Sequence, residues 1–358
     1  METPAVLINQ QVLENNILRM AEKVGETKRV QLRPHIKTHK NPEIAKRQLD
    51  SGAVGITVAK LGEAEVMIDG GIQDIFLAYP LVTTDKLNWG LSLAKTIDRF
   101  IFSVDTFEGA ERLNQVAENR GMTVEIRLEI NTGLNRTGVE LEEGVTFAES
   151  LRQFKQLKLT GIYTYRGSKL LDGEATKDTY SAGIEEGTAM VGLAKDLREV
   201  GIDIKDVSVG SSLSIDGVLA VEGVTEVRPG TYVFNDAMQM SYGVCSQVDC
   251  AATVLVTVVS KHGKRIVIDG GSKAFATDVQ PTKVPTLISG FGCVKGYPNV
   301  LFERMNEEHG VLLLTDEEIQ IGDTLELIPN HICSTINLYD VYYVNQQAVA
   351  IAARGKTQ

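Results

Sequence analysis

The residues best suited to chemistry lie in residues 33–40, which follow a short apolar run and carry four cationic or imidazole groups at alternate positions. An apolar run of this kind is typical of a strand, and in an extended chain alternate side chains share one face. The residues that would share it are Arg33, His35, Lys37 and His39. Cationic neighbours disfavour the ammonium form of a lysine, and a neutral amine can form a Schiff base. The segment predicts a nucleophilic Lys37, with a solvated basic loop as the alternative.

Two glycine-containing segments could hold an anion. Residues 209–212 follow the seventh expected strand and residues 228–231 follow the eighth. In a parallel barrel this is the usual location of a phosphate site built from backbone N–H groups. Ordinary turns are the alternative.

Three more side chains could complete such a site. Residues 131–138 place Arg136 between two glycines after the fifth strand, and its guanidinium suits a cofactor oxygen or a substrate carboxylate. Tyr163 and Tyr165 are two apart on the sixth strand and would share a face beneath an aromatic ring. Core packing is the commoner fate of such a tyrosine pair.

A histidine and a cysteine two positions apart, His331 and Cys333, follow a proline near the C-terminus. In an extended segment both side chains point the same way, as two zinc ligands require. A structural zinc site needs four ligands, and the sequence has no Cys-x-x-Cys pair to supply the others. A metal here would therefore keep open positions for water or substrate. The alternative is a half-buried histidine beside an inert thiol.

Composition narrows the function classes. The 358 residues include 43% hydrophobic and 23% charged residues, which is typical of a folded globular chain. With 36 basic and 47 acidic residues the net charge is −11, so nucleic acid is not an expected partner. No stretch has the length and apolar character of a membrane span, and the N-terminus lacks signal-peptide features, so we expect a cytoplasmic protein. The four cysteines are expected to be free thiols or metal ligands.

Between about residues 25 and 235, short apolar runs alternate with amphipathic stretches, which is the pattern of repeated βα units. Helix starts are expected at Asn9, at Asn41 followed by proline, and at Asp105-Thr106. The eight expected strands are residues 30–33, 54–58, 75–78, 100–104, 124–130, 159–165, 206–209 and 224–227. The pattern predicts a (β/α)8 TIM-type barrel in residues 1–240.

After residue 240 the sequence changes to β-branched runs separated by turns. The expected strands here are residues 252–260, 265–269, 324–328 and 340–343. Residues 241–358 are therefore predicted to form a C-terminal antiparallel β domain that carries the metal site.

Taken together, these segments resemble the D-serine dehydratase and D-threonine aldolase family, which belongs to the fold-type III enzymes that bind pyridoxal 5′-phosphate on an alanine racemase-like barrel. Residues 33–40 resemble the family's cofactor-lysine motif, residues 307–310 a further recurrent element and residues 329–333 its metal motif. The resemblance covers nearly the whole chain.

The resemblance implies a role for each candidate residue. Lys37, rather than Lys40, would carry pyridoxal 5′-phosphate, with His35 beside it, and Arg136 would reach the cofactor ring oxygen. One of Tyr163 or Tyr165 would approach the pyridine. The residues that would hold the phosphate are Gly210, Ser211, Gly230 and Thr231. A divalent metal facing the cofactor would be held by His331 and Cys333. Thiolate and imidazole donors favour zinc. The resemblance also implies a homodimer.

One departure from the family pattern bears on the reaction. In the aldolase pattern that this chain resembles, the segment after the sixth strand reads Tyr-x-Gly-His, whereas this chain has Ser168 in place of the histidine. The metal pair of that pattern tends to be His with Asp, whereas this chain has His331 with Cys333. Both differences favour dehydration. We therefore predict a metal-assisted lyase that converts a small D-3-hydroxy amino acid, such as D-serine, into a 2-oxo acid and ammonia. The alternatives are an aldolase, a racemase and a non-catalytic cofactor-binding protein; the roughly 120 residues after the barrel argue against the last.

Overall fold

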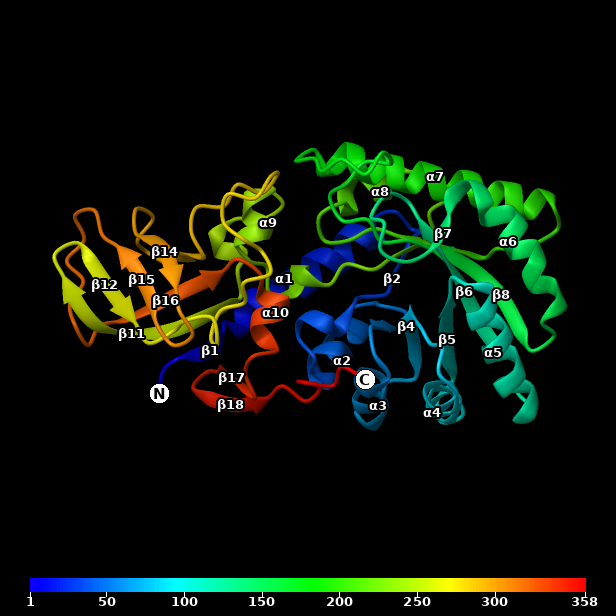
Figure 1. Ribbon diagram of the computed structural model, residues 1–358, viewed down its shortest axis with the longest axis horizontal. Coiled ribbons are helices and arrows are strands. Elements are labelled where there is room, and N and C mark those ends of the chain that lie inside the picture. Colours follow the sequence, from blue (N-terminus) through cyan, green and yellow to red (C-terminus); the bar gives the residue numbers. More distant parts are fainter. The chain divides into compact units, whose positions relative to one another are not determined.

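The computed structural model describes residues 1–358, which divide into two compact units (Figure 1). The first, called here the barrel unit, contains residues 20–37, 42–230 and 356–358. The second, called the β unit, contains residues 1–19, 38–41 and 231–355. The chain therefore crosses between the units directly after Lys37 and directly after Gly230.

The barrel unit contains eight parallel strands in the order β2-β10-β9-β8-β6-β5-β4-β3, with the short β7 (Val139–Glu140) paired to β6. The eight strands are β2 (Gln31–Leu32), β3 (Ile56–Val58), β4 (Asp74–Pro80), β5 (Arg99–Val104), β6 (Val124–Asn131), β8 (Leu157–Tyr163), β9 (Asp206–Val209) and β10 (Glu226–Val227). The ring closes where Val54 N–H donates to Leu32 O at 2.9 Å and Thr57 N–H to Pro34 O at 2.8 Å. All eight predicted strands and the predicted barrel are confirmed.

Helices connect these strands. Their bounds are α1 (Gln10–Gly25), α2 (Pro42–Asp50), α3 (Leu61–Asp69), α4 (Thr84–Ala94), α5 (Phe107–Asn119), α6 (Gly144–Ser150), α7 (Thr179–Glu199) and α8 (Ile215–Ala220). Asn9 Oδ1 accepts the Val12 N–H at 3.1 Å, and Thr106 Oγ1 accepts the Gly109 N–H at 3.2 Å. These caps satisfy backbone donors that have no partner within a helix. They confirm the helix starts that the sequence predicted.

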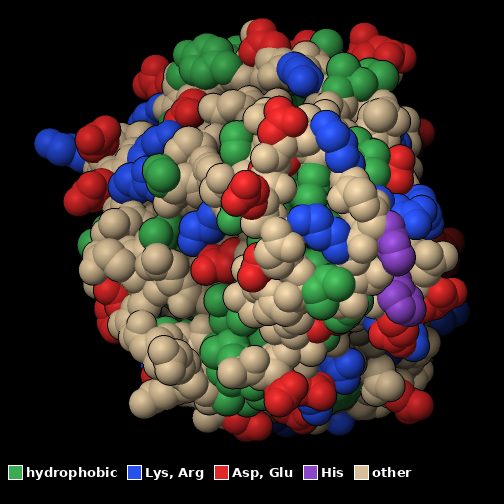
Figure 2. Space-filling model, turned by 90° about the vertical axis from the view of Figure 1, so that its left-hand side faces the viewer, with side chains coloured by type: hydrophobic (Ala, Val, Ile, Leu, Met, Phe, Trp, Pro, Cys, Tyr) green, Lys and Arg blue, Asp and Glu red, His purple; other side chains and the backbone are tan.

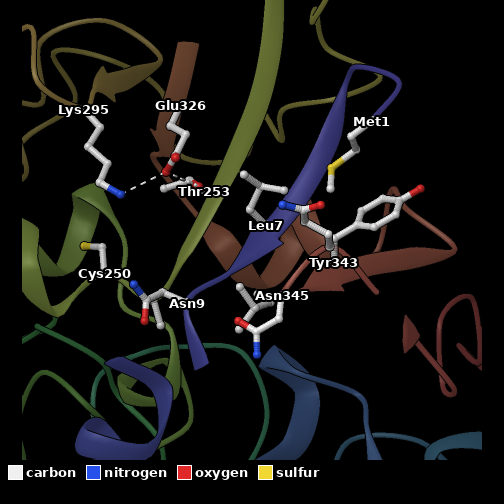
Figure 3. A pocket seen from close by; sticks show the side chains of 12 residues that line it. Met1, Leu7, Asn9, Cys250, Thr253, Lys295, Glu326, Tyr343 and Asn345 are labelled. Atoms are coloured by element: carbon white, nitrogen blue, oxygen red, sulfur yellow. Dashed lines mark hydrogen bonds and ion pairs between the residues drawn. The ribbon is translucent and has the colours of Figure 1, made fainter. Parts of the chain in front are cut away.

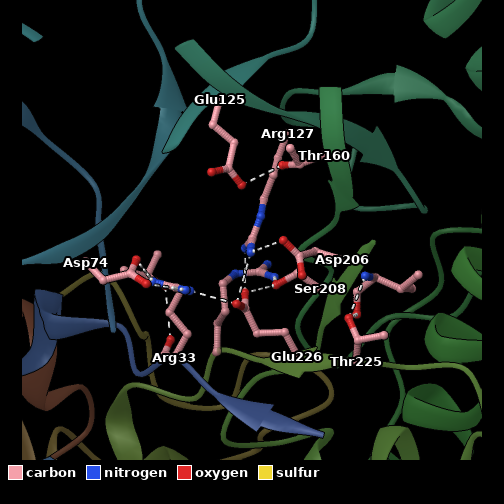
Figure 4. Close-up of polar contacts among 12 residues, drawn as sticks. Arg33, Asp74, Glu125, Arg127, Thr160, Asp206, Ser208, Thr225 and Glu226 are labelled. Atoms are coloured by element: carbon pink, nitrogen blue, oxygen red, sulfur yellow. Dashed lines mark hydrogen bonds and ion pairs between the residues drawn. The ribbon is translucent and has the colours of Figure 1, made fainter. Parts of the chain in front are cut away.

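The interior of the barrel holds a cluster of charges in place of a purely apolar core (Figure 4). Arg33 and Arg127 are fully buried and share the buried Glu226, at 2.7 Å and 2.5 Å respectively. Asp74 lies 2.5 Å from Arg33, and Asp206 lies 2.9 Å from Arg127. Burial alone would raise the pKa of Glu226, but the two guanidinium groups hold it well below its usual range. Glu226 is therefore an ionised carboxylate inside the barrel.

The β unit contains nine strands in the order β12-β15-β14-β13-β16-β11-β1-β17-β18, and β12 also pairs with β11, which closes a barrel. All pairs are antiparallel except β1 with β17. The strands are β1 (Ala5–Ile8), β11 (Ala252–His262), β12 (Arg265–Ile268), β13 (Gly292–Val294), β14 (Leu301–Met305), β15 (Gly310–Leu313), β16 (Thr324–Pro329), β17 (Val341–Val344) and β18 (Gln347–Ala350). The four strands predicted after residue 240 are confirmed as β11, β12, β16 and β17.

Strand β1 was not expected from the sequence, yet it lies between β11 and β17, with Val6 paired to both Val254 and Tyr342. Two short helices, α9 (Ala237–Ser241) and α10 (Ile332–Ile336), complete the unit. The predicted boundary at residue 240 remains a prediction, while the contacts group β1 with the C-terminal strands.

The surface and the cysteines agree with the composition. None of the helices combines the length and the apolar character needed to cross a bilayer. All four cysteines are free thiols. Figure 2 shows basic and acidic side chains interspersed over the face in view, without a patch of one sign. This face offers no concentrated basic surface to a polyanion.

We expect Glu226→Gln to lower the free energy of unfolding by about 3–5 kcal/mol, because it leaves two buried guanidinium groups without their shared carboxylate. Urea unfolding at pH 7 measures this. The control is Glu199→Gln, whose side chain is 65% exposed and 3.9 Å from Lys195, and which should change stability by less than about 0.5 kcal/mol.

The same carboxylate predicts a pH dependence. Folding lowers the pKa of Glu226. The stability that the ionised carboxylate contributes is therefore fully present above the pKa of an unfolded glutamate, and it is lost as the pH falls from there toward the folded-state pKa. The difference between wild type and Glu226→Gln should therefore shrink in acid. A difference that stays constant down to the acid unfolding transition would contradict this account.

Candidate active site

The lysine segment begins as an extension of β2. The His35 N–H donates to Pro229 O at 3.0 Å, and His35 also forms a parallel bridge with Thr57. The chain then forms a 3-10 turn over Ile36–Thr38. The expectation that alternate residues from 33 to 39 share one face is therefore wrong, because the extended conformation ends at His35. The Arg33 guanidinium lies in the buried charge cluster instead, where Glu226 and Asp74 neutralise it.

Two of the predicted site residues, Lys37 and Arg136, lie over the ring of a third, Tyr165. Lys37 Nζ lies 5.1 Å from the centroid of the Tyr165 ring, and the guanidinium carbon of Arg136 lies 5.2 Å from the same centroid. His35 Nδ1 accepts the backbone N–H of Lys37 at 3.3 Å, which fixes the turn that presents the lysine. An amine, a guanidinium and an aromatic ring in this arrangement can hold a planar, anionic ligand.

The structure separates the two tyrosines that the sequence left as alternatives. β8 ends at Tyr163, so Tyr165 does not continue the same strand face. Tyr163 is buried; its hydroxyl lies 2.5 Å from Ser103 Oγ and donates to Glu129 Oε2 at 2.9 Å. Burial raises the pKa of the Tyr163 hydroxyl well above its usual value. Of the two rings, Tyr165 is the one beside Lys37, and Tyr163 is bound within the barrel.

Glu129 is a site residue that the sequence analysis missed. It accepts hydrogen bonds from Tyr163 and, at 2.9 Å, from Thr137, and its carboxylate lies 3.8 Å from Arg136 Nη2. Burial raises its pKa. A signal was present, because Glu125, Arg127 and Glu129 alternate with apolar residues along β6. Charges at alternate positions of a barrel strand indicate a polar interior face.

The predicted phosphate segments follow two neighbouring strands. β10 pairs with β9 in parallel register, Val227 opposite Val209, so the residues after both strands leave the barrel at the same edge. Gly210 has φ +81°, and a Cβ there would lie 2.8 Å from a methyl carbon of Val218. Arg228 is buried and donates to Thr164 O at 2.5 Å. A glycine turn beside a buried arginine suits a phosphate group.

The predicted phosphate ligands differ in their surroundings. The Gly210 N–H donates to Glu186 Oε1 at 3.3 Å, so glycine serves the turn there. Ser211 is buried next to it. Gly230 is the last residue of this stretch of the barrel unit, whereas Thr231 belongs to the β unit, where its Oγ1 lies 3.5 Å from Cys333 Sγ.

The predicted metal pair lies directly after β16. His331 is extended (φ −137°, ψ 104°), but Cys333 lies in the first turn of α10, so the expectation of one extended segment is wrong. The two side chains still approach each other, because they share a hydrogen bond. Thr38 Oγ1 lies 3.0 Å from Cys333 Sγ, and Thr38 follows Lys37 in the chain. An imidazole and a thiol held together in this way fit two ligands of a zinc ion.

Asp278 supports this pair from 53 residues away. Its Oδ2 lies 2.6 Å from His331 Nδ1 and accepts the Ser334 hydroxyl at 2.8 Å. Burial lowers the pKa of His331, but the interaction with the Cys333 side chain and the hydrogen bond to Asp278 outweigh it and raise the pKa to about 11. A carboxylate on Nδ1 leaves Nε2 for a metal, which is the usual outer support of a metal-binding histidine. No spacing in the sequence could have indicated this contact.

His331 and Cys333 are the two candidate metal ligands of this segment. The structure contains no group of three or more His, Cys, Asp or Glu side chains arranged to hold a metal ion. The pair formed by His331 and Cys333 would therefore leave positions for water or substrate, as catalytic zinc sites do.

Two other features lie apart from these residues. Residues 307–310 connect β14 to β15, His309 is exposed, and Glu308 pairs with Lys273 at 2.6 Å. A cavity of about 220 Å³ in the β unit is lined by residues of β1, β11 and β16, among others, and Glu326 accepts hydrogen bonds there from Lys295 and Thr253 (Figure 3). None of the predicted site residues lines this cavity.

Two family models match the chain. The model of the alanine racemase N-terminal domain matches residues 8–237, and the model of the serine dehydratase domain matches residues 251–345. By its parallel barrel, with a lysine segment after the first barrel strand, the protein is of the alanine racemase-like class. It belongs to the family of the alanine racemase N-terminal domain, joined here to a serine dehydratase domain.

Curated relatives and solved structures agree with this assignment. D-threo-3-hydroxyaspartate dehydratase from Delftia sp. (strain HT23) is 31% identical over 100% of this chain and 96% of its own length. D-serine dehydratase from Dictyostelium discoideum is 28% identical over 96% of this chain and 93% of its own length. The crystal structure of D-threonine aldolase from Filomicrobium marinum has a TM-score of 0.85 and 27% identity, covering 100% of this chain and 97% of that one. The predicted resemblance to dehydratases and aldolases of D-amino acids is confirmed.

One further structure bears on the metal. A cysteine-to-alanine variant of D-threo-3-hydroxyaspartate dehydratase, described as the metal-free form, has a TM-score of 0.87 and 28% identity, covering 98% of this chain and 97% of that one. A variant of the same dehydratase replaces a histidine two positions before that cysteine. The spacing is the same as between His331 and Cys333.

We expect Asp278→Asn to weaken zinc binding by about ten- to a hundredfold, because the amide no longer supports the His331 ring as a carboxylate does. A competition titration against a chromogenic chelator measures the affinity. Asp316→Asn is the matched control, since the Asp316 side chain is 99% exposed. Equal zinc affinity in wild type and Asp278→Asn would contradict the supporting role.

Proposed function

We propose that the protein is a pyridoxal 5′-phosphate-dependent, metal-assisted lyase that acts on a small D-3-hydroxy amino acid, with D-serine dehydration to a 2-oxo acid and ammonia as its reaction. The observation that carries the proposal is the group formed by Lys37, Tyr165 and Arg136 on a barrel of this family. When bound, the cofactor supplies an electron sink for the charge that develops at Cα. We also infer a homodimer, as the resemblance implies, and a cytoplasmic location, as expected from the sequence.

The residues of the barrel unit have separate roles in the proposed reaction. The Lys37 amine would hold the cofactor covalently, and as a free amine it would accept the proton from Cα of the substrate. Tyr165 and Arg136 orient the cofactor ring, and His35 fixes the turn that carries Lys37. The residues that receive the phosphate are Gly210, Ser211, Gly230 and Thr231.

In the β unit, His331 and Cys333 bind a divalent metal. A thiolate and an imidazole suit Zn²⁺ better than a hard ion such as Mg²⁺. A Lewis acid on the substrate's β-hydroxyl makes it a better leaving group. The metal-free cysteine variant of the Delftia-type dehydratase supports the same role for Cys333.

The second candidate is retro-aldol cleavage, which the similarity to D-threonine aldolase favours. Cleavage requires a base for the substrate hydroxyl. In the segment after β8, where the aldolase pattern resembles Tyr-x-Gly-His, this chain has Ser168, which has no basic side chain. We therefore place dehydration first.

The cofactor lysine can be tested directly. The purified protein with bound cofactor should show a visible absorbance band, and borohydride should fix the label on the peptide that contains Lys37. Lys37→Ala should lose the band, because Lys37 is the lysine within the turn Ile36–Thr38. Recovery of the label on Lys40, or on neither lysine, would overturn the assignment.

The metal can be tested by its removal. Chelation should lower 2-oxo acid formation from D-serine by orders of magnitude, because leaving-group assistance contributes several kcal/mol to the barrier. The visible band should survive, since metal and cofactor attach to different residues. Cys333→Ala should reproduce the loss, and Cys245→Ala, another free thiol, should not. Full 2-oxo acid formation without metal would contradict the role of the metal. L-serine as the product from D-serine would favour a racemase, and glycine with an aldehyde from D-threonine would favour an aldolase.

A further inference from the structure

A buried acid of α7 contacts the turn that the proposed function assigns to the cofactor phosphate. Glu186 is 1% exposed. Its Oε1 accepts the Gly210 N–H at 3.3 Å, and its Oε2 accepts the Ser214 hydroxyl at 3.1 Å. One side chain therefore holds both ends of residues 210–214, which we call the serine loop.

The serine loop also has internal hydrogen bonds, one of which uses the Ser214 hydroxyl. Ser214 Oγ accepts the Ser211 N–H at 3.1 Å, and Ser211 Oγ accepts the Leu213 N–H at 3.2 Å. Removing the Glu186 carboxyl would release the Ser214 hydroxyl and the Gly210 N–H together. The serine loop would lose two anchors at once, while its internal bonds would remain.

Glycines bring α7 close enough for this contact. A Cβ on Gly183 would lie 2.4 Å from Ser214 O, and a Cβ on Gly217 would lie 2.1 Å from Tyr180 O. α7 therefore packs backbone against backbone on the start of α8. Glu186 is three residues from Gly183, on the same face of the helix.

Charge makes this carboxyl unusual. A phosphate group is an anion, and a carboxylate buried beside its site would repel it. Burial raises the pKa of Glu186, although Arg166 and Arg228 act in the opposite direction. Both contacts of this carboxyl, with the Gly210 N–H and the Ser214 hydroxyl, use its oxygens as acceptors.

We propose that Glu186 is a positioning residue, which holds the serine loop in the conformation that receives the phosphate of pyridoxal 5′-phosphate. The proposal rests on the proposed function, because that function places the cofactor phosphate at this loop. Glu186 itself does not touch the cofactor; it acts through Gly210 and Ser214.

The test compares two ligands on apo-protein. Pyridoxal 5′-phosphate and pyridoxal share the aldehyde that reacts with a lysine, but only the first carries the phosphate. Glu186→Ala should raise the dissociation constant for pyridoxal 5′-phosphate by about tenfold or more, as expected for the loss of two buried hydrogen bonds. The dissociation constant for pyridoxal should stay within about twofold. Both are measured by absorbance titration.

Two more variants sharpen the result. Glu186→Gln should raise the constant less than Glu186→Ala does, because the amide oxygen can still accept the Gly210 N–H and the amide NH2 can donate to Ser214 Oγ. Glu199→Ala, an exposed position of the same helix, should leave both constants unchanged. Circular dichroism shows whether each variant is folded, and if Glu186→Ala is not, Ser214→Ala tests the same link by removing the hydroxyl.

The possible results distinguish a failure of this proposal from a failure of the proposed function. An unchanged constant for pyridoxal 5′-phosphate in a folded Glu186→Ala or Ser214→Ala variant would overturn the positioning role, as would an equal rise for both ligands. Failure of the wild type to bind pyridoxal 5′-phosphate would overturn the proposed function and this proposal with it. A rise limited to the phosphorylated ligand, and smaller in Glu186→Gln than in Glu186→Ala, supports the proposal.

Discussion

The two arginines that share Glu226 inside the barrel are the interaction on which the site depends. Arg33 lies two residues before His35, so its pairing with Glu226 fixes where the lysine segment leaves the barrel. Glu226 begins β10, and the arginine and glycine of the second phosphate segment follow at the far end of that strand. A slip of either strand by one residue would leave a charge buried without its partner. A single carboxylate therefore sets the register of both segments.

Much of the fold was predictable because it rests on local patterns. Apolar runs separated by helical stretches located all eight barrel strands, and the caps at Asn9 and Thr106 located helix starts within one or two residues. Motif residues after strand ends were also informative, because parallel strands deliver such residues to one edge. The group formed by Lys37, Tyr165 and Arg136 follows from this geometry.

Other features were not predictable because they depend on contacts between distant residues or on local backbone turns. Nothing in the spacing indicated that Asp278 contacts His331. The 3-10 turn after His35 and the helical position of Cys333 each break the alternation that extended chain would give. Strand β1 was missed because four residues before a helix carry too little pattern to be read as a strand.

The placement of β1 has a consequence for the order of folding during synthesis. Val6 is made before nearly all of the chain, but its partners Val254 and Tyr342 emerge only after the whole barrel has been translated. The barrel unit needs no residue beyond Gly230 to complete its strands and can form first on the ribosome. Until then the backbone of β1 is an unpaired edge of apolar residues, open to pairing with another nascent chain. The β unit is therefore the late, slow part of folding, because its central pairings join the most distant parts of the sequence.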